Sequence, residues 1–130
     1  MILLDTHVAV WMTTDKTLLS TPAATSIREA SRNGGGVAIA DQTLWEVAMI
    51  SSKGGFRLPK SLAEYLRYLE SVFVVLPINA AIAELSVSFS PQYPKNPTDR
   101  LIGATALAHE LPLVTKDSQI HSSGEVRCIW

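Results

Sequence analysis

The sequence predicts an α/β fold, a three-layer α/β/α arrangement in which helices cover both faces of a central parallel sheet of about five strands. Short apolar runs alternate along the chain with stretches that carry helix-capping residues. These runs are apolar throughout, which is typical of strands buried on both faces of a parallel sheet. A chain of 130 residues can form one continuous core but not two, so we expect residues 1–130 to form a single domain.

The first half of the chain predicts two strands and four helices. Strands are expected over residues 2–4 and 37–40, and helices over residues 8–12, 22–32, 42–52 and 58–70. Thr21 is expected to cap the second helix because Pro22 follows it, and Gly34, Gly35 and Gly36 are expected to end that helix. Asp41 is expected to cap the third helix.

The second half predicts three more strands and two helices. Strands are expected over residues 72–76, 113–115 and 126–129, and helices over residues 79–89 and 98–110. A proline-rich loop, residues 91–97, precedes the last of these helices, which has Leu101, Ile102, Thr105 and Ala108 on one face.

Composition excludes several classes of protein. The net charge of −1 gives no basic excess, which argues against a stable nucleic-acid binder but less against an enzyme with an acidic site. The single cysteine, Cys128, rules out an internal disulfide and a cysteine-rich zinc site. No apolar run is long enough to span a membrane, and no secretory signal is visible. We therefore expect a cytoplasmic protein without a membrane partner.

Four acidic residues fall near the predicted strand ends. Asp5 directly follows the first strand, and Asp117 lies two residues after the fourth. Glu46 lies about one turn into the third helix, and Asp99 lies in the first turn of the helix after the proline-rich loop. Ligands of open parallel sheets bind beyond the carboxyl ends of the strands, near the point where strand order reverses. These four acids are therefore expected to converge on one site.

Converging carboxylates point to a divalent cation, because without one they repel each other and lose hydration. Oxygen-only ligands favour Mg²⁺ or Mn²⁺. Such ions activate water and neutralise charge on a phosphodiester, so hydrolysis of that bond is the reaction that suits the four acids best.

Each acid also has a structural explanation. Asp5 would cap the helix that follows it, and Asp117 would suit a turn. Asp99 would complement the dipole of a helix capped by Asn96. Glu46 is harder to explain in this way, because its helix is apolar almost all round and should bury it, which requires a partner such as a metal or Arg100.

Four segments together resemble the PIN-domain ribonucleases, specifically the VapC-like toxins of type II toxin–antitoxin pairs. The segments are Leu4-Asp5-Thr6-His7, Leu44-Trp45-Glu46-Val47-Ala48, Pro97-Thr98-Asp99-Arg100-Leu101-Ile102 and Leu113-Val114-Thr115-Lys116-Asp117. Their order and spacing cover nearly the whole chain. The resemblance matches Asp5, Glu46, Asp99 and Asp117 to the acidic metal-binding positions of the family.

The resemblance implies a PIN-like fold and Mg²⁺- or Mn²⁺-dependent endonucleolytic cleavage of RNA. It also implies a homodimer and inhibition by a cognate antitoxin. Thr115 matches a hydroxyl that often supports the site, and Thr6 follows the first Asp as in many members. Asn96 stands where many members carry another Asp, a departure that keeps helix capping but removes a charge near the second metal.

Several residues stay open between two interpretations. His7 could touch RNA but is better explained as a helix-start residue, and Trp11 and Trp45 are expected in the core rather than as platforms for bases. Arg100 would either pair with an acid or contact phosphate.

Two other enzyme classes are disfavoured. A haloacid-dehalogenase-like phosphatase needs a second Asp at the position of His7, and a receiver domain needs an acidic pair near the first strand. The remaining alternative is a PIN-like module that binds RNA or protein without catalysis.

Overall fold

A five-stranded, fully parallel sheet crosses the middle of the molecule, as predicted. The computed structural model describes residues 1–33 and 35–130, so Gly34 of the predicted helix stop lies outside the described residues. The strand order is β3-β2-β1-β4-β5, which puts the first strand of the chain at the centre. The strands are β1 (Ile2–Leu4), β2 (Val37–Ala40), β3 (Val74–Leu76), β4 (Leu113–Val114) and β5 (Cys128–Ile129).

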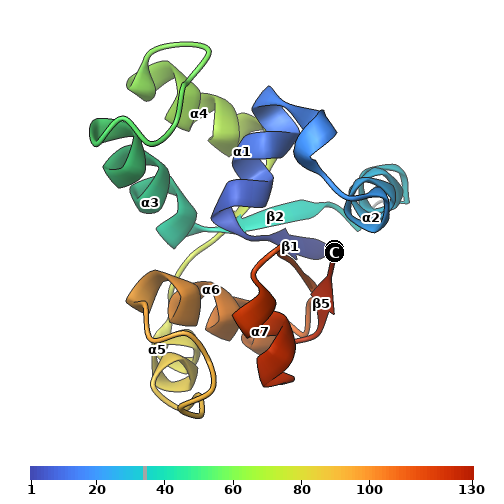
Figure 1. Ribbon diagram of the computed structural model, residues 1–130, viewed down its shortest axis with the longest axis vertical. Helices are drawn as coiled ribbons and strands as arrows, with labels where there is room; N and C mark the ends of the chain where they lie inside the picture. Colours follow the sequence, from blue (N-terminus) through green and yellow to red (C-terminus); the bar gives the residue numbers. More distant parts are fainter. Residues whose placement is uncertain (34) are drawn as a thin grey trace.

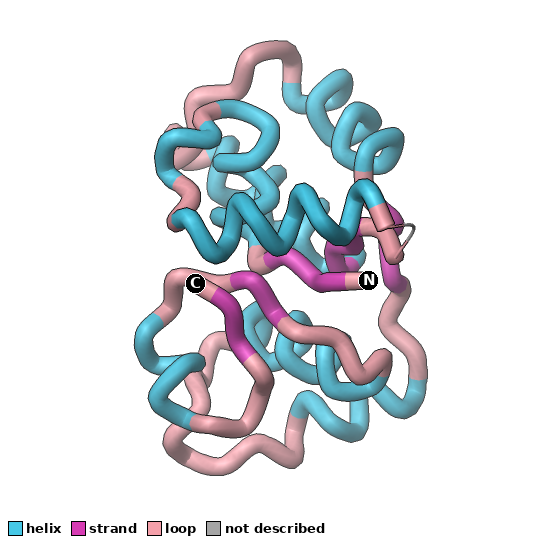
Figure 2. The backbone as a smooth tube through the Cα atoms, turned by 90° about the vertical axis from the view of Figure 1, so that its right-hand side faces the viewer, coloured by secondary structure: helices cyan, strands magenta, loops and turns pink. Residues whose placement is uncertain are grey.

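Helices cover both faces of this sheet, so the predicted three-layer arrangement is confirmed (Figure 1). The helices are α1 (Thr6–Thr14), α2 (Thr21–Arg32), α3 (Asp41–Ser52), α4 (Leu62–Val72), α5 (Ala80–Ser86), α6 (Pro97–Ala108) and α7 (Ser118–Ser123), with a 3₁₀ turn at Lys16–Leu18. Figure 2 shows the strands as a band with helices above and below it. The 3₁₀ turn and α7 were not predicted, because their short segments carry no apolar periodicity.

Alternating side chains of the strands enter two clusters of one core, one cluster on each face of the sheet. Leu4 and Ile39 pack into one cluster with residues of α1, α2 and α4, whereas Leu3 and Ala38 pack into the other with residues of α6 and α7. Both faces of the central strands are thus fully apolar, which explains why the strands appear in the sequence as unbroken apolar runs. Within the described part of the chain, no helix has both the length and the apolar character needed to cross a bilayer.

Two predicted helix caps are wrong. Ser20, not Thr21, caps α2, since its Oγ accepts a hydrogen bond from the Ala23 N–H at 3.2 Å. Asp41 does not cap α3 but lies within its first turn, and its Oδ2 accepts a hydrogen bond from the Ile78 N–H at 3.1 Å. Asp41 therefore ties the chain after β3 to the end of β2.

Several element ends also differ from the prediction. Strand β3 begins at Val74 rather than Val72, because α4 continues through Val72. Helix α1 begins earlier than expected, at Thr6, and α5 ends earlier, at Ser86. Strand β4 ends at Val114, and β5 begins only at Cys128.

Helix α6 ends at Ala108 rather than at Glu110, because the backbone of Glu110 turns into the left-handed region at φ 54°. The Leu111 N–H then bonds to the Ala106 carbonyl at 2.8 Å, which closes a Schellman motif. Ala108, expected on the apolar face, is exposed.

Tyr93 fixes the start of α6. The ring is fully buried, stacks on Phe89 and donates a hydrogen bond from its Oη to the Asp99 carbonyl at 3.0 Å. Gly103 lies one turn further along α6, and a Cβ there would overlap the Tyr93 hydroxyl. The absence of a side chain at position 103 is therefore what lets Tyr93 reach the first turn of α6.

We predict that Gly103→Ala lowers the free energy of unfolding by about 1–3 kcal/mol, the usual cost of overpacking a buried site. Urea unfolding measures the loss. The double variant Gly103→Ala/Tyr93→Phe should lose less than the sum of its two single variants, because phenylalanine lacks the oxygen that the new Cβ would meet. Strictly additive losses would contradict this explanation.

Candidate active site

The site lies at the carboxyl ends of β1 and β4, where the strand order reverses. From β1 the sheet extends in one direction through β2 to β3, and in the other through β4 to β5. Crossover connections leave β1 and β4 on opposite sides at this point, which opens a crevice in parallel sheets. Asp5 directly follows β1, and Asp117 follows β4 after Thr115 and Lys116.

Asp5 is held by its neighbours on both carboxylate oxygens. Its Oδ1 accepts a hydrogen bond from the Thr6 N–H at 2.9 Å, which makes Asp5 the N-cap of α1. Its Oδ2 accepts one from the Thr115 hydroxyl at 2.7 Å. The Asp5 backbone N–H also bonds to the Val114 carbonyl at 3.0 Å, so the residue is attached to β4 through main chain and side chain alike.

Thr115 joins two of the acids. Besides donating to Asp5, its hydroxyl oxygen accepts a hydrogen bond from the Asp117 N–H at 3.1 Å. The Asp117 carboxylate is oriented in turn by α7, whose first N–H groups, from Gln119 and Ile120, donate to its Oδ1 at 2.8 and 3.1 Å. One threonine side chain thus positions Asp5 and Asp117 relative to each other.

Glu46 reaches the site from α3. Its side chain is 9% exposed, as expected from the apolar character of its helix. Behind it, the hydroxyls of Thr6 and Thr43 share a hydrogen bond of 3.1 Å, which joins α1 to α3. Arg100 does not supply the partner considered for Glu46, since its Nε donates to the Pro94 carbonyl at 3.0 Å.

Asp99 lies in the first turn of α6. Asn96 caps this helix as predicted, with its Oδ1 accepting the Thr98 N–H at 2.9 Å. Tyr93 holds the Asp99 carbonyl, so the backbone of this turn is fixed while the carboxylate is left to face the site.

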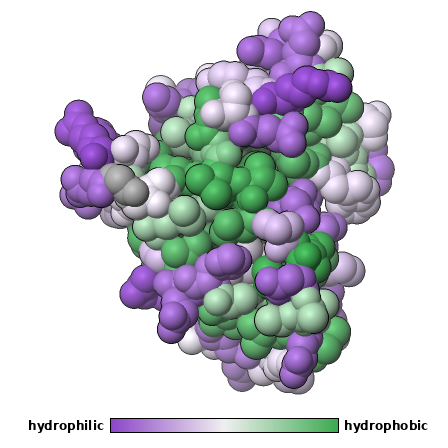
Figure 3. All heavy atoms as spheres, turned by 180° about the vertical axis from the view of Figure 1, so that it is seen from behind, coloured by the Kyte–Doolittle hydropathy of each residue, from purple (hydrophilic) through white to green (hydrophobic). Residues whose placement is uncertain are grey.

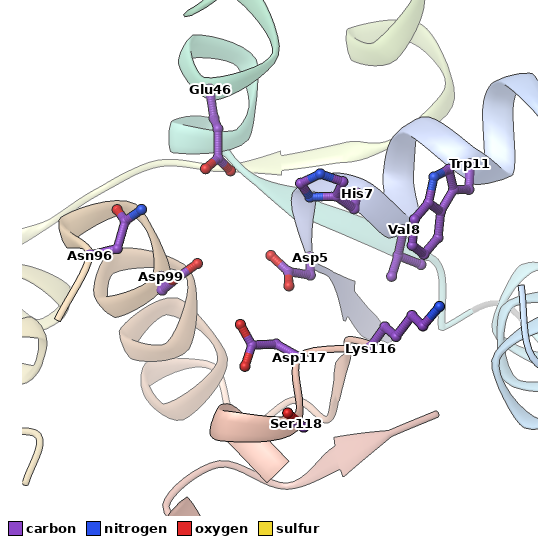
Figure 4. Close-up of a pocket in the computed structure, with 10 residues that line it drawn as sticks. All are labelled: Asp5, His7, Val8, Trp11, Glu46, Asn96, Asp99, Lys116, Asp117 and Ser118. Atoms are coloured by element: carbon purple, nitrogen blue, oxygen red, sulfur yellow. The ribbon is translucent and has the colours of Figure 1, made fainter. Parts of the chain in front are cut away.

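The four carboxylates point into one pocket of about 570 Å³ (Figure 4). Its lining residues are Asp5, His7, Val8, Trp11, Glu46, Asn96, Asp99, Lys116, Asp117 and Ser118. Within residues 1–33 and 35–130, no three Asp, Glu, His or Cys side chains lie close enough to form a ligand group around a single ion. The acids therefore share a pocket without forming a compact cluster.

The electrostatics of the pocket favour protonation of Asp5, Glu46 and Asp99. Burial raises the pKa of Asp5, although hydrogen bonds from Thr115 and Thr6 lower it in part. Burial also raises the pKa of Glu46, against a hydrogen bond from Thr6. Burial, together with the charges of the other three acids, raises the pKa of Asp99 to about 7. A cation in the pocket would relieve the desolvation and the repulsion at once.

Three aromatic or basic residues, for which the sequence does not predict a place in the site, line the pocket. Trp11 lines the pocket rather than lying wholly in the core, and His7 begins α1 as expected but also faces the pocket. Lys116 also lines the pocket, although the sequence pattern assigns it no role of its own; its position directly before the acid that follows β4 is the signal that indicates it. Trp45, expected in the core, is 54% exposed because α3 turns Thr43, Glu46 and Val47 inward.

Comparisons with known proteins agree on one family. The model of the PIN domain family matches residues 2–125. Ribonuclease VapC22 of Mycobacterium tuberculosis (strain H37Rv) is 31% identical over 131 aligned positions, which cover 99% of this chain and 98% of that protein.

Solved structures share the fold. A chain of the VapBC2 complex from Rickettsia felis, bound to a DNA fragment from its promoter, superposes with a TM-score of 0.73 at 18% identity. That match covers 98% of this chain and 97% of the other. A chain of a toxin–antitoxin complex from Klebsiella pneumoniae gives a TM-score of 0.64 at 24% identity and covers 91% and 88%.

We predict that Asp99→Asn flattens the pH dependence of stability in EDTA. The folded carboxyl has a pKa of about 7, whereas that of an unfolded Asp is near 3.9. Between these values the folded state holds a proton that the unfolded chain has lost, so the free energy of unfolding falls as pH rises through this window. Above about pH 7 the variant should be the more stable by about 1 kcal/mol, after allowance for solvent screening.

Urea unfolding at several pH values measures this effect. Asp15→Asn is the matched control, because Asp15 is an exposed acid outside the pocket. If Asp99→Asn keeps the pH slope of the wild type, the pocket does not destabilise the charged form of Asp99.

Proposed function

The chain belongs to the PIN-domain family, and from this premise we propose that it is an endoribonuclease that depends on Mg²⁺ or Mn²⁺. The observation that carries the proposal is the convergence of Asp5, Glu46, Asp99 and Asp117, from four separate elements, on one pocket at the strand-order reversal. The similarity to a ribonuclease over nearly the full length supports RNA as the substrate.

The donor groups suit a small divalent ion. All four are carboxylates, which are the ligands that Mg²⁺ and Mn²⁺ prefer. The lack of a compact ligand cluster among the described residues does not conflict with this choice, because Mg²⁺ keeps several of its waters and is usually bound through only a few carboxylates together with substrate phosphate. We infer that the same four acids would hold the ion or ions.

A bound divalent ion would activate a water and neutralise the phosphodiester. The protein itself holds the carboxylates in position. Thr115 and Thr6 hold the Asp5 carboxylate from two sides, and the first turn of α7 holds Asp117. Glu46 and Asp99 face them from α3 and α6, so the substrate phosphate would lie between two walls fixed by regular structure. Thr6, Thr115 and Asn96 act here as positioning residues.

The alternative is a PIN-like module that binds RNA or protein without cutting. A module that has lost catalysis has no need to keep repelling acids in one pocket, because each costs stability when charged. The raised pKa values of Asp5, Glu46 and Asp99 indicate that this cost is present. Retention of all four acids therefore favours the enzyme.

We further propose that the chain is the toxin of a toxin–antitoxin pair, acting in the cytoplasm, and forms a homodimer. Two structures of the same fold were solved as toxin–antitoxin or VapBC complexes. Figure 3 shows apolar surface across the middle of the face seen from behind. Val72, Val74 and Ile78, on or beside the edge strand β3, are among the exposed large apolar side chains. Exposed apolar surface of this kind is typical of protein interfaces.

We predict that RNA cleavage requires Mg²⁺ or Mn²⁺ and stops in EDTA. Asp5→Asn should reduce the cleavage rate by roughly 100-fold or more, the scale on which preorganised charged groups act. It should leave folding intact, because asparagine is also a good N-cap for α1. The matched control is Asp15→Asn, which removes an exposed capping acid outside the pocket and should keep full activity.

Thermal unfolding with and without Mg²⁺ gives a readout besides activity. The ion should raise the midpoint of the wild type, since it binds only the folded state, and should raise that of Asp5→Asn much less. Full cleavage by Asp5→Asn would overturn the assignment, and binding of RNA without cleavage in either metal would support the non-catalytic module.

The antitoxin proposal is tested by producing this chain together with the protein that is encoded next to it in the genome. The two chains should purify as one complex, and RNA cleavage should be suppressed relative to the chain alone. Light scattering on the chain alone should give twice the mass of one chain. If the neighbour neither binds nor inhibits, the antitoxin assignment is wrong.

A further inference from the structure

The pocket also contains aromatic and basic side chains that metal binding by the carboxylates does not explain. His7 and Trp11 line it from α1, with His7 near Asp5 and Glu46 and Trp11 farther from the acids (Figure 4). They are four residues apart and so lie on the same face of the helix, with their ring centroids 5.8 Å apart in an edge-on arrangement. We call the four rings of His7, Trp11, Phe56 and Trp130 the aromatic wall; the last two support the first two.

The outer two rings of the wall hold His7 and Trp11 in place. Phe56 contacts His7 at 5.3 Å between ring centroids, and Trp130 contacts Trp11 at 5.9 Å. These contacts restrict the rotation of both side chains of α1. His7 is nevertheless exposed and Trp11 only partly buried, so the wall presents aromatic surface to the pocket.

Lys116 completes this part of the pocket. Its Nζ lies over the Trp11 ring, 5.8 Å from the centroid, and it directly precedes Asp117. Among the residues that line the pocket, all of them in the described part of the chain, it is the one lysine or arginine. An exposed cation beside both aromatic surface and an acid is well placed for a phosphate that follows a stacked base.

The wall is fixed relative to the acids. Asp5 is the N-cap of α1, and His7 and Trp11 belong to the first two turns of that same helix. A volume of about 570 Å³ falls within the 300–1,000 Å³ or so that is common for small-ligand sites. The pocket therefore has room beside the carboxylates for more than a phosphate group.

We propose that the aromatic wall stacks one unpaired base of the substrate next to the scissile phosphodiester, with Lys116 on the adjoining phosphate. The inference rests on the proposed nuclease function and deepens it. Bases within an A-form duplex are stacked on each other and do not present a free face to a protein, whereas unpaired bases stack readily on aromatic side chains. His7 and Trp11 are then specificity-determining residues rather than structural ones.

An abasic scan tests the stacking directly. The substrate is a short unstructured oligoribonucleotide in Mg²⁺, in which each base in turn is removed. In the wild type, loss of one base beside the cleaved bond should lower kcat/KM by roughly 5- to 100-fold, the usual effect of one stacking contact. The loss should appear mainly in KM, because stacking binds substrate and transition state alike.

Trp11→Leu and His7→Ala should remove this sensitivity. Each should lower kcat/KM on the intact strand, and the abasic strand should then be cut no worse than the intact one. Leucine keeps apolar contact with Trp130, and His7 is exposed, so at least one variant is expected to fold. Trp45→Phe is the matched control, because Trp45 is exposed and outside the pocket. Equal abasic losses in wild type, Trp11→Leu and His7→Ala would overturn the proposal.

Binding separates this inference from the nuclease assignment. In Trp45→Phe the remaining tryptophans, Trp11 and Trp130, both belong to the wall. With Ca²⁺ replacing Mg²⁺, single-stranded oligoadenylate should quench their fluorescence, and the same strand annealed to oligouridylate should not. Quenching without cleavage in any metal would keep the stacking site and reject the nuclease. Cleavage without quenching would keep the nuclease assignment and reject the stacking site.

Discussion

The gathering of four carboxylates in one pocket, where burial and then mutual repulsion oppose their charge, is the constraint on which the rest of this structure depends. Burial and mutual charge raise the pKa of Asp5, Glu46 and Asp99, so each charged acid opposes the fold that holds it. The scaffold must therefore fix them with interactions stronger than this opposition. A parallel sheet with an apolar cluster packed on each face supplies that rigidity, and the crevice at the strand-order reversal supplies the space.

Local structure offsets part of the repulsion. Asp5 and Asp117 are N-caps of α1 and α7, and Asp99 lies in the first turn of α6. Free backbone N–H groups at a helix start favour a negative charge, so three helix starts directed at one pocket stabilise the acids that they position. The structural and functional explanations of these residues, which compete when each acid is considered in the sequence alone, describe the same contacts in the folded protein.

The sheet, its parallel sense and the burial of Glu46 were predictable because each follows from an uninterrupted apolar pattern. The ends of the helices and strands were less predictable, since they depend on contacts that no local sequence pattern encodes. Asp41 is a residue type that often caps helices, but its side chain accepts a hydrogen bond from the Ile78 N–H instead. Helix α6 ends where the backbone of Glu110 enters the left-handed region. Convergence of the four acids was predicted from their strand-end positions. Their separation was not, and neither was the role of Tyr93, which comes from a proline-rich loop yet is fully buried.

The Thr115–Asp5 hydrogen bond joins residues 110 positions apart, and β4 is the partner of the central strand β1. During synthesis, β1 leaves the ribosome long before β4, and long-range parallel pairing is slow to form. Asp5 therefore stays without its hydroxyl partner, and without Asp117, until β4 and the residues after it have been synthesised and have paired with β1. The pocket is thus one of the last features of the fold to form, and any activity that it has depends on the completed pairing of β4 with β1.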